Sequence, residues 1–401
     1  MVEDRKLDYE NILKRVLTSA KANDFAGYSK FDALNSPLLS VLSLNNKWLR
    51  LMYTQTVKQC PANIRPLLGV RKSRNPKGIA LFTRAYLFLY EATGNQQYLN
   101  EAESLLQWLL DNPSLKQHNL CWGYNFTWQS TLFLQNMFEP NVNVTVFVGE
   151  ALIHAYRVTK EEKYLEWARS VARFILNDIP VLLEDENELA IAYVLRKVDA
   201  VVLNNNALAG AFLIKLWKET GDEELRTTAT KLITYTVNRR TEYYAWYYTH
   251  PKSKSSITHD NYHTGGILDA LIEFFEETGD ETFMEVYRKG LEYYRKHLFE
   301  PDGAPRWMND RRYPYDIHGA AQGIITFAKA GRLENIYPEQ AGKIAGWTHA
   351  NLFRPETDDY AYRNGRFMKW NYSLMRWCNA WMTRALGEFL DASLHERGKS
   401  S

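Results

Sequence analysis

Two short segments place an aspartate just ahead of a histidine, and the first spans residues 258–266. It reads THDNYHTGG, with Asp260 three residues before His263 and Tyr262 between them. One of its polar residues is expected to cap a helix, because helix N-caps favour Asp, Asn and Thr. Two histidines and an aspartate exceed what a cap needs, and a carboxylate beside an imidazole can transfer protons. We therefore expect Asp260 and His263 to be catalytic and Tyr262 to contact a ligand.

The second segment, residues 311–322, reads RRYPYDIHGAAQ and repeats the arrangement. Asp316 precedes His318 by two residues, and Gln322 follows one helical turn later. If both segments begin neighbouring helices of one ring, the two Asp/His pairs converge on its axis. We expect Asp316 and Asp260 to be the acid and base of the reaction, with His318 and His263 orienting them.

A third segment combines aromatic rings with amides. Residues 121–130 read CWGYNFTWQS. Rings stack against flat, partly apolar ligand faces, and amides exchange hydrogen bonds with hydroxyl groups. This combination suits a sugar, although a small hydrophobic cluster beneath a long loop would have the same composition. The candidate substrate-binding residues are Trp122, Tyr124, Asn125, Trp128 and Gln129.

Two further segments give weaker signals. Residues 199–206 read DAVVLNNN; one asparagine is expected to cap a helix, and we take Asn205 as a substrate-binding candidate. Residues 358–381, DDYAYRNGRFMKWNYSLMRWCNAW, either form a salt-bridged terminal helix or contribute to the site. An Arg or Lys there could hold a carboxylate. The candidates in this segment are Lys369, Tyr372, Arg376 and Trp377.

The element that must position these side chains is an internal repeat. Each copy begins with an apolar, Gly- and Ala-rich stretch, turns, and continues with apolar and charged residues at helical spacing. Three copies turn at Thr-Gly-Asn or Thr-Gly-Asp, where glycine suits the left-handed position that ends a helix. The copies occupy residues 78–108, 144–174, 206–235, 262–293 and, more loosely, 318–347.

Each copy therefore predicts a hairpin with a buried inner helix and an amphipathic outer helix. A sixth hairpin can be assembled from the chain ends, with residues 372–394 as its inner helix and residues 6–21 as its outer helix. The prediction is an all-α fold, an (α/α)6 toroid with two helix rings, in one domain over residues 1–401. An open α-solenoid is the alternative, disfavoured because the unusual residues all precede inner helices.

Composition excludes several classes of protein. The net charge is +2, so no global field favours nucleic acid or a membrane surface, and no stretch is apolar enough to span a bilayer. The three cysteines are isolated, and no phosphate-binding, metal-protease or zinc motif occurs. We expect no metal or cofactor. The N-terminal residues lack a signal peptide, so we expect a cytoplasmic protein.

The repeat resembles that of the six-hairpin glycosidase superfamily. More closely, the chain resembles proteins from bacterial and archaeal surface-polysaccharide gene clusters, many mislabelled "delta-aminolevulinic acid dehydratase". That label finds no support, since no lysine or zinc constellation of such an enzyme is visible. The resemblance implies an (α/α)6 toroid and a role with polysaccharides. It is carried by FDALNSP (31–37), RPLLGV (65–70), PKGIALF (76–82), WGYNFTWQ (122–129), DNYHTG (260–265), PYDIH (314–318) with Gln322, and RWCNAWMTRAL (376–386).

Three functions remain open. The first is a glycoside hydrolase that acts on an acidic surface polysaccharide or its precursor. The second is a uronate C5-epimerase or lyase, in which a Tyr or His abstracts the C5 proton while Arg376 or Lys369 neutralises the carboxylate. The third is a non-catalytic glycan-binding protein. In each case the expected partner is an oligo- or polysaccharide, with uronate-containing and neutral sugars both left open.

Overall fold

A closed ring of six helices forms the centre of the molecule. We describe it from a computed structural model of residues 8–114, 118–333 and 337–399, without the side chains of residues 395–399. Each inner helix packs against the next, and the last packs against the first. Most residues of these helices are buried, and in α12 every residue is buried. They are α4 (Pro76–Thr93), α6 (Val142–Thr159), α8 (Leu203–Thr220), α10 (Asn261–Thr278), α12 (Ile317–Gly331) and α14 (Trp381–Lys399), which follows the π-helical turn η4 (Met375–Ala380).

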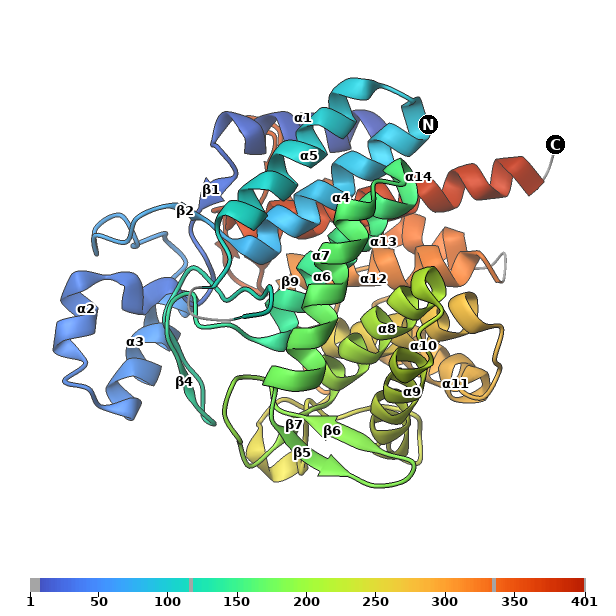
Figure 1. Cartoon of the computed structure of the whole chain (residues 1–401). Coiled ribbons are helices and arrows are strands. Elements are labelled where there is room, and N and C mark those ends of the chain that lie inside the picture. Colours follow the sequence, from blue (N-terminus) through green and yellow to red (C-terminus); the bar gives the residue numbers. More distant parts are fainter. Residues whose placement is uncertain (1–7, 115–117, 334–336, 400–401) are drawn as a thin grey trace.

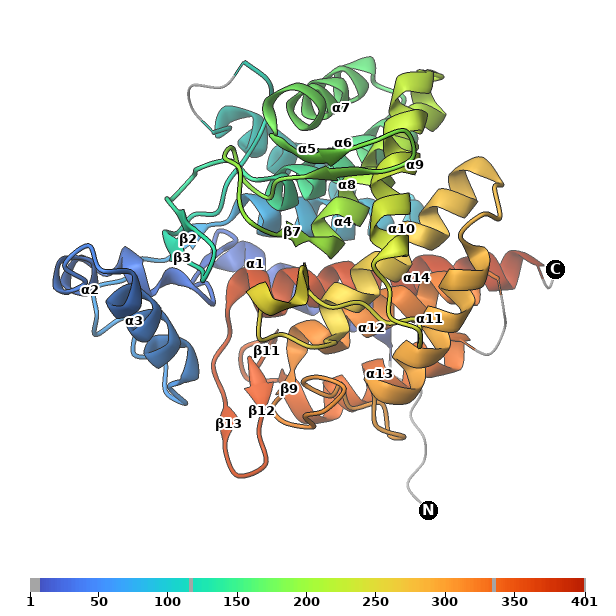
Figure 2. The same cartoon turned by 90° about the horizontal axis from the view of Figure 1, so that it is seen from below.

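A second set of helices surrounds this ring (Figures 1 and 2). Each outer helix packs against its inner partner and leaves a polar face towards solvent, as the amphipathic pattern predicts. The outer helices are α1 (Tyr9–Ala22), α5 (Gln96–Asp111), α7 (Glu162–Arg173) with its π-helical extension η2 (Phe174–Asp178), α9 (Glu223–Asn238), α11 (Met284–His297) and α13 (Tyr337–Leu352). The predicted (α/α)6 toroid is confirmed.

The sixth hairpin joins the two ends of the chain. Helix α1 packs against α14, and the ring of Tyr9 meets that of Phe389 edge-on at a centroid distance of 5.2 Å. The inner helix begins at Met375, three residues later than expected, because residues 369–370 pair in a small sheet. Residues 6 and 7 of the predicted outer helix lie outside the described part of the chain.

The turns within the hairpins follow the predicted chemistry. Gly94, Gly221 and Gly279 end α4, α8 and α10 with φ of 67°, 70° and 71°. A side chain at such φ values is strained, so glycine is the favoured residue at these positions.

The strands that the structure describes are short and antiparallel. They lie in the loops between hairpins, and the largest sheet has three strands, in the order β13-β12-β9. The pairs are β1 (Ala26–Gly27) with β2 (Ser73–Arg74), β3 (Trp128–Gln129) with β4 (Leu134–Gln135), β5 (Val181–Glu184) with β6 (Leu189–Ile191), β7 (Val201–Val202) with β8 (Thr249–His250), β10 (Phe353–Arg354) with β11 (Asp359–Tyr360), and β12 (Arg363–Asn364) with both β13 (Lys369–Trp370) and β9 (Tyr315–Asp316).

One helical hairpin lies outside the two rings and was not predicted. It consists of α2 (Pro37–Leu42) and α3 (Lys47–Gln59), after the short 3-10 helix η1 (Asp32–Asn35). Figures 1 and 2 both show it projecting from the side of the molecule. A second 3-10 helix, η3 (Lys252–Lys254), precedes α10.

Candidate active site

A cavity of about 830 Å³ lies where the inner helices begin and extends along the ring axis. Its wall includes the second residue of every inner helix, if η4 is taken as the start of the last one. These six residues occupy equivalent places in the six hairpins: Lys77, Asn143, Asn204, Tyr262, His318 and Arg376. The cavity therefore collects one side chain from each unit of the repeat.

The deeper part of the cavity is a buried ion-pair network. Lys215 donates to both carboxylate oxygens of Glu150 at 2.7 Å and lies 2.9 Å from Glu273. Lys329 contacts Glu273 at 2.5 Å and Asp269 at 3.3 Å. Burial alone would raise the pKa of Glu273, but Lys215 and Lys329 outweigh it and lower that pKa. Glu273 is therefore held as a charged partner of the two lysines.

Asp260 and His263 form a tight pair at the start of α10. Asp260 caps the helix by accepting from the His263 backbone N–H at 2.9 Å. Its other carboxylate oxygen accepts from His263 Nδ1 at 2.7 Å. The imidazole contacts the rings of Tyr248 and Tyr262 at centroid distances of 4.3 and 4.4 Å. The Asp260 bond fixes the tautomer and leaves Nε2 for a ligand.

His318 lies beside this pair on α12, within an aromatic enclosure. Its ring is parallel to that of Tyr262 within 7°, at a centroid distance of 4.6 Å, and contacts Trp377 and Trp381 at 4.3 and 4.2 Å. Neither ring nitrogen has a hydrogen-bond partner in the described part of the chain, although the residue is buried. Burial, and then the charge of Lys77, hold the pKa of His318 well below its usual range. The imidazole is thus neutral at neutral pH.

In the outer part of the cavity, outside the ion-pair network, the cationic side chains of the wall include four that bear on the site: Lys30, Lys58, Lys77 and Arg376. Among the described residues, Lys30 is the one of the four with a carboxylate within 4 Å, its Nζ lying 3.6 Å from Asp316. That Nζ also sits 3.5 Å from the Trp377 ring centroid, a cation–π contact. Burial lowers the pKa of Lys30 to about 7 and that of Lys58 to about 8. Burial also holds the pKa of Lys77 well below its usual range. The described carboxylates thus compensate little of the charge that these side chains carry when protonated, and an anionic ligand would stabilise that charge.

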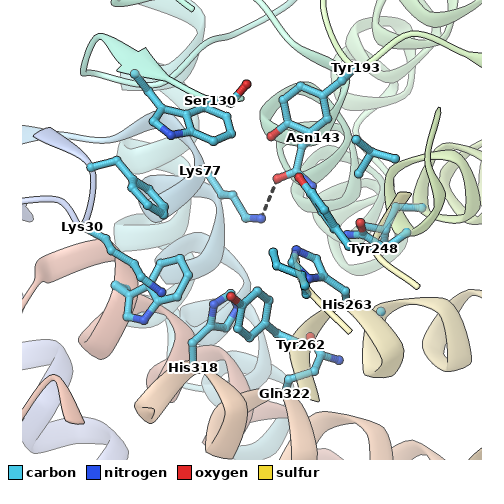
Figure 3. Close-up of a pocket in the computed structure, with 18 of the residues that line it drawn as sticks. Lys30, Lys77, Ser130, Asn143, Tyr193, Tyr248, Tyr262, His263, His318 and Gln322 are labelled. Carbon is cyan, nitrogen blue, oxygen red and sulfur yellow. Dashed lines mark hydrogen bonds between the residues drawn. The ribbon is translucent and has the colours of Figure 1, made fainter. Parts of the chain in front are cut away.

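A hydrogen-bond chain holds Lys77 in place, and Figure 3 shows its first bond, from Lys77 to Asn143. Lys77 Nζ donates to Asn143 Oδ1 at 2.8 Å, and the same oxygen accepts from the Tyr124 hydroxyl at 3.1 Å. The Tyr124 hydroxyl also lies 3.2 Å from that of Tyr193. The Arg376 guanidinium lies over the Tyr124 ring, and its Nε has no partner within the residues described. Lys77 and Arg376 are thus positioned for a ligand that supplies acceptor oxygens.

Compared by sequence, the chain matches no family model and no curated protein. Solved structures do match it. The cellobiose 2-epimerase of Bacillus thermoamylovorans B4167 has a TM-score of 0.63 at 13% identity, over 80% of this chain and 90% of that one. The glycoside hydrolase family 76 mannosidase Bt3792 of Bacteroides thetaiotaomicron VPI-5482 has a TM-score of 0.64 at 12% identity, over 98% and 100%.

The fold is shared. Lin0763 from Listeria innocua also has it, with a TM-score of 0.62 at 14% identity over 98% of this chain and 99% of that one. The epimerase and the mannosidase are members of the six-hairpin glycosidase superfamily, as the resemblance in the repeat predicts. At these identities the likeness establishes the architecture, and function must be argued from the site.

The structure brings most of the expected site residues together. The cavity wall contains Tyr124, Trp128, Gln129, Tyr262, His263, His318, Gln322, Arg376 and Trp377. Gln322, one turn after His318 on α12, donates from Nε2 to Asp269 at 2.9 Å and so joins the ion-pair network. Helix α10 allows this approach at Gly265, where a Cβ would lie 2.5 Å from Gln322 Cγ.

Other expected residues lie behind the cavity wall. Trp122 is buried in the core, where its indole donates to the Leu109 carbonyl at 2.8 Å. Asn125 donates to Ser73 Oγ at 2.7 Å and joins two loops. Tyr372 packs near Arg65 and donates to the Cys60 carbonyl. None of the three lines the cavity.

The three consecutive asparagines are not helix caps. Helix α8 begins at Leu203, so they occupy its first turn, and its N-cap residue, Val202, makes no side-chain cap. Asn204 reaches the cavity, whereas the expected residue, Asn205, does not. One position along a helix turns a side chain by about 100°, so Asn205 points away from the axis.

The two aspartates lie at the same end of the ring but behind the cavity wall. Asp316 caps α12 by accepting from the His318 backbone N–H at 3.0 Å, and the same oxygen accepts from Trp377 Nε1 at 2.7 Å. Both carboxylate oxygens of Asp260 accept hydrogen bonds from His263. Neither aspartate lines the cavity. The imidazoles of His263 and His318 therefore line the cavity, whereas the two aspartates, expected to face the ligand, do not. Asp260 orients the imidazole of His263, and Asp316 bonds the backbone N–H of His318.

Sequence reasoning missed several residues of the wall: Lys30, Lys58, Lys77, Asn143, Tyr193 and Tyr248. Lys77 and Asn143 could have been found, because each occupies the helix position that His318 occupies in its own hairpin. Tyr193, Tyr248 and Lys30 come from loops between hairpins, for which the repeat sets no register. Residues 358–372 were expected at the cavity but do not line it, and Lys369 is exposed on β13.

No group of three His, Cys, Asp or Glu side chains in the described ranges could hold a metal ion. Among the helices described, none has the length and apolar character needed to cross a bilayer.

Proposed function

We propose that the protein is a carbohydrate-active enzyme that moves a proton on an acidic sugar, as a uronate epimerase or lyase does. The observation that carries this proposal is His318, a buried imidazole whose two nitrogens have no partner in the described structure and whose side chain lines the cavity. A buried polar group without a partner is costly unless it has a task. A neutral imidazole with a free nitrogen can act as a general base.

The second histidine supplies the matching group. His263 Nδ1 is held by Asp260, so its Nε2 is free to exchange a proton with a ligand. In an epimerisation one histidine, neutral at the start, takes the proton from C5 of the uronate, and the other, which must begin as an imidazolium, returns a proton to the opposite face. Proton exchange with water then restores both histidines to their starting states. A lyase begins with the same abstraction and then breaks the bond between C4 and its oxygen substituent.

The charge of the outer cavity supports an acidic substrate. A proton next to a carboxylate is weakly acidic, and cations that neutralise the carboxylate stabilise the developing negative charge. Lys77 and Arg376 are buried beside the two histidines. One of the solved structures that share the fold is a sugar epimerase, the cellobiose 2-epimerase, which is consistent with this chemistry.

Hydrolysis is supported less well. A hydrolase needs two carboxyl groups on opposite sides of the scissile bond. The carboxylates that line the cavity are Glu150, Asp269 and Glu273, each paired with a lysine. The family 76 neighbour keeps hydrolysis as the competing enzyme hypothesis.

The test is incubation with uronate-containing and neutral oligosaccharides in heavy water, followed by NMR. The proposal predicts deuterium at C5 of a uronate, or an unsaturated product formed by elimination. New reducing ends without deuterium at C5 would indicate a hydrolase. Binding without any change in the sugar would indicate a glycan-binding protein.

A further inference from the structure

The projecting hairpin α2–α3 and the loop that follows it carry many exposed apolar side chains. Of the sixteen large hydrophobic residues that the described chain exposes, seven fall within residues 38–67. Trp48 is 71% exposed, Val41 74%, and Leu44, in the turn between the helices, 77%. The other four are Leu38, Leu42, Met52 and Leu67.

These side chains are not needed for the hairpin's own packing. A separate small core of Ala33, Leu39 and Val57, with Tyr53 packed against it, holds the segment together from the inner side. On α2 the exposed positions are 38, 41 and 42, and on α3 they include 48 and 52. Residues spaced by three or four lie on one helix face. Each helix thus presents an apolar face to solvent.

The same region is basic and contains no acid. Residues 33–90 include no Asp or Glu. Lys47, Arg71 and Lys72 are exposed, and Arg50 is half-buried. Lys47 donates to the Thr131 carbonyl and Arg50 bonds to Asn45, so neither is paired with a carboxylate. Exposed apolar side chains among unpaired cations match the surface of an anionic bilayer.

We propose that this hairpin docks on an anionic lipid membrane, with Leu44 and Trp48 inserting at the headgroup level. A second copy of the chain fits the surface less well. In a symmetric dimer the same patch faces itself, so the cations of one protomer would face those of the other without any carboxylate. Trp is favoured at membrane interfaces because one side of its ring is apolar and its N–H is polar.

The cavity lies next to this surface. Leu51, Gln55 and Lys58 line the cavity from α3, the helix that exposes Trp48 and Met52. Docking therefore brings the cavity entrance to the bilayer, where a glycan carried on a lipid could reach it. That consequence rests on the proposed function, whereas membrane binding does not.

The test is sedimentation of the full chain with vesicles of equal parts phosphatidylcholine and phosphatidylglycerol, and with pure phosphatidylcholine vesicles. We expect binding to the anionic vesicles that weakens with added salt. Trp48→Glu and Leu44→Glu should each weaken it by about tenfold or more. Leu333→Glu is the matched control: Leu333 is 40% exposed and follows α12, at the end of the ring remote from the cavity, and its change should leave binding unaltered.

Circular dichroism must show that the variants fold like the wild type, as expected for exposed positions. The proposal is overturned if wild-type protein stays in the supernatant with anionic vesicles, or if Leu333→Glu loses binding as much as Trp48→Glu. It is also overturned if sedimentation equilibrium finds a dimer that Trp48→Glu dissociates while vesicles are not bound, because the hairpin is then a self-interface. Failure of the enzyme proposal would leave these results unchanged.

Discussion

The imidazole of His318 lies parallel to the phenol ring of Tyr262, with planes within 7° and centroids 4.6 Å apart. Both are the second residue of their helices, α12 and α10, which are neighbours in the inner ring. The stacking fixes the imidazole while its two nitrogens remain without a hydrogen-bond partner in the described structure. His318 is therefore held in position by ring contacts alone.

Replacing His318 with phenylalanine should separate activity from stability. Phe keeps the ring contacts with Tyr262, Trp377 and Trp381 but removes two buried, unpartnered nitrogens. We expect the free energy of unfolding to rise by about 1 kcal/mol, since an unsatisfied polar group is lost. Turnover should fall by about a hundredfold or more. Denaturant unfolding and a sugar assay on the same preparation would measure both; a less stable, fully active variant would show that His318 is structural.

The two aspartates should respond differently to an Asn substitution. Asp260→Asn would place an amide against His263 Nδ1 and favour the tautomer with a proton on Nε2, so turnover should fall by about a hundredfold. Asp316→Asn keeps an oxygen for the His318 backbone N–H and for Trp377 Nε1. Its turnover should change by less than about threefold, because Asn caps a helix as well as Asp does. Equal losses in both variants would contradict the roles assigned to the histidines.

The cationic side chains of the outer cavity should strengthen the binding of acidic sugars and leave the binding of neutral sugars unchanged. Lys77→Met should weaken binding of a uronate-containing oligosaccharide by about tenfold or more, the expected cost of one charge-assisted hydrogen bond. A neutral oligosaccharide should bind the variant as well as it binds the wild type. Lys369→Met is the control, since Lys369 is exposed and away from the cavity. Titration calorimetry measures both affinities; equal losses for acidic and neutral sugars would refute a role for Lys77 in recognising charge.

Lys30 should make stability depend on pH. Its pKa is about 7 in the folded protein, against the ordinary lysine value of 10.5, mainly because of burial, with Asp316 opposing and Lys58 and Arg363 adding to the shift. Between these values the unfolded chain holds the extra proton, so this group makes stability rise with pH, by up to about 1.4 kcal/mol per unit. Below pH 7 Lys30 is protonated in both the folded and the unfolded chain. The folded state then bears the whole free-energy cost of burying the charged lysine.

Comparison with Lys30→Met isolates this contribution. The variant should be more stable than the wild type near pH 6, and the difference should shrink as the pH rises towards 10. Lys369→Met, which removes an exposed lysine, should follow the wild type at every pH. Denaturant titrations across this range measure the effect, and a constant offset between Lys30→Met and wild type would contradict it.

The repeat made the fold predictable because its signals are local. Glycine at positions such as 94, 221 and 279 ends an inner helix by a backbone requirement that neighbours cannot change. The apolar inner and amphipathic outer stretches then define the two rings. The α2–α3 hairpin was not predicted because its apolar side chains are exposed, so they do not mark a buried face.

The site residues that could be predicted from the sequence are those at the starts of the inner helices, where the repeat fixes their positions. Tyr262, His318 and Arg376 begin inner helices, and they line the cavity. Trp122 was misassigned because a Trp in a loop suggests a ligand platform, whereas its indole completes the core. Lys30 could not be found, since its burial depends on Trp377 and Asp316, which are distant in sequence.

The central claim is proton transfer to and from a sugar carbon by His263 and His318. The most direct measurement is NMR of an oligouronate after incubation in heavy water with wild-type protein and with His318→Phe. We expect deuterium at C5 with the wild type, either in the epimerised sugar or in sugar that has returned to its original configuration, and loss of the C5 proton by elimination if the enzyme is a lyase. We expect neither with the variant. Cleavage of the glycosidic bond by water with C5 left protonated would contradict the claim, as would equal deuterium incorporation by the variant.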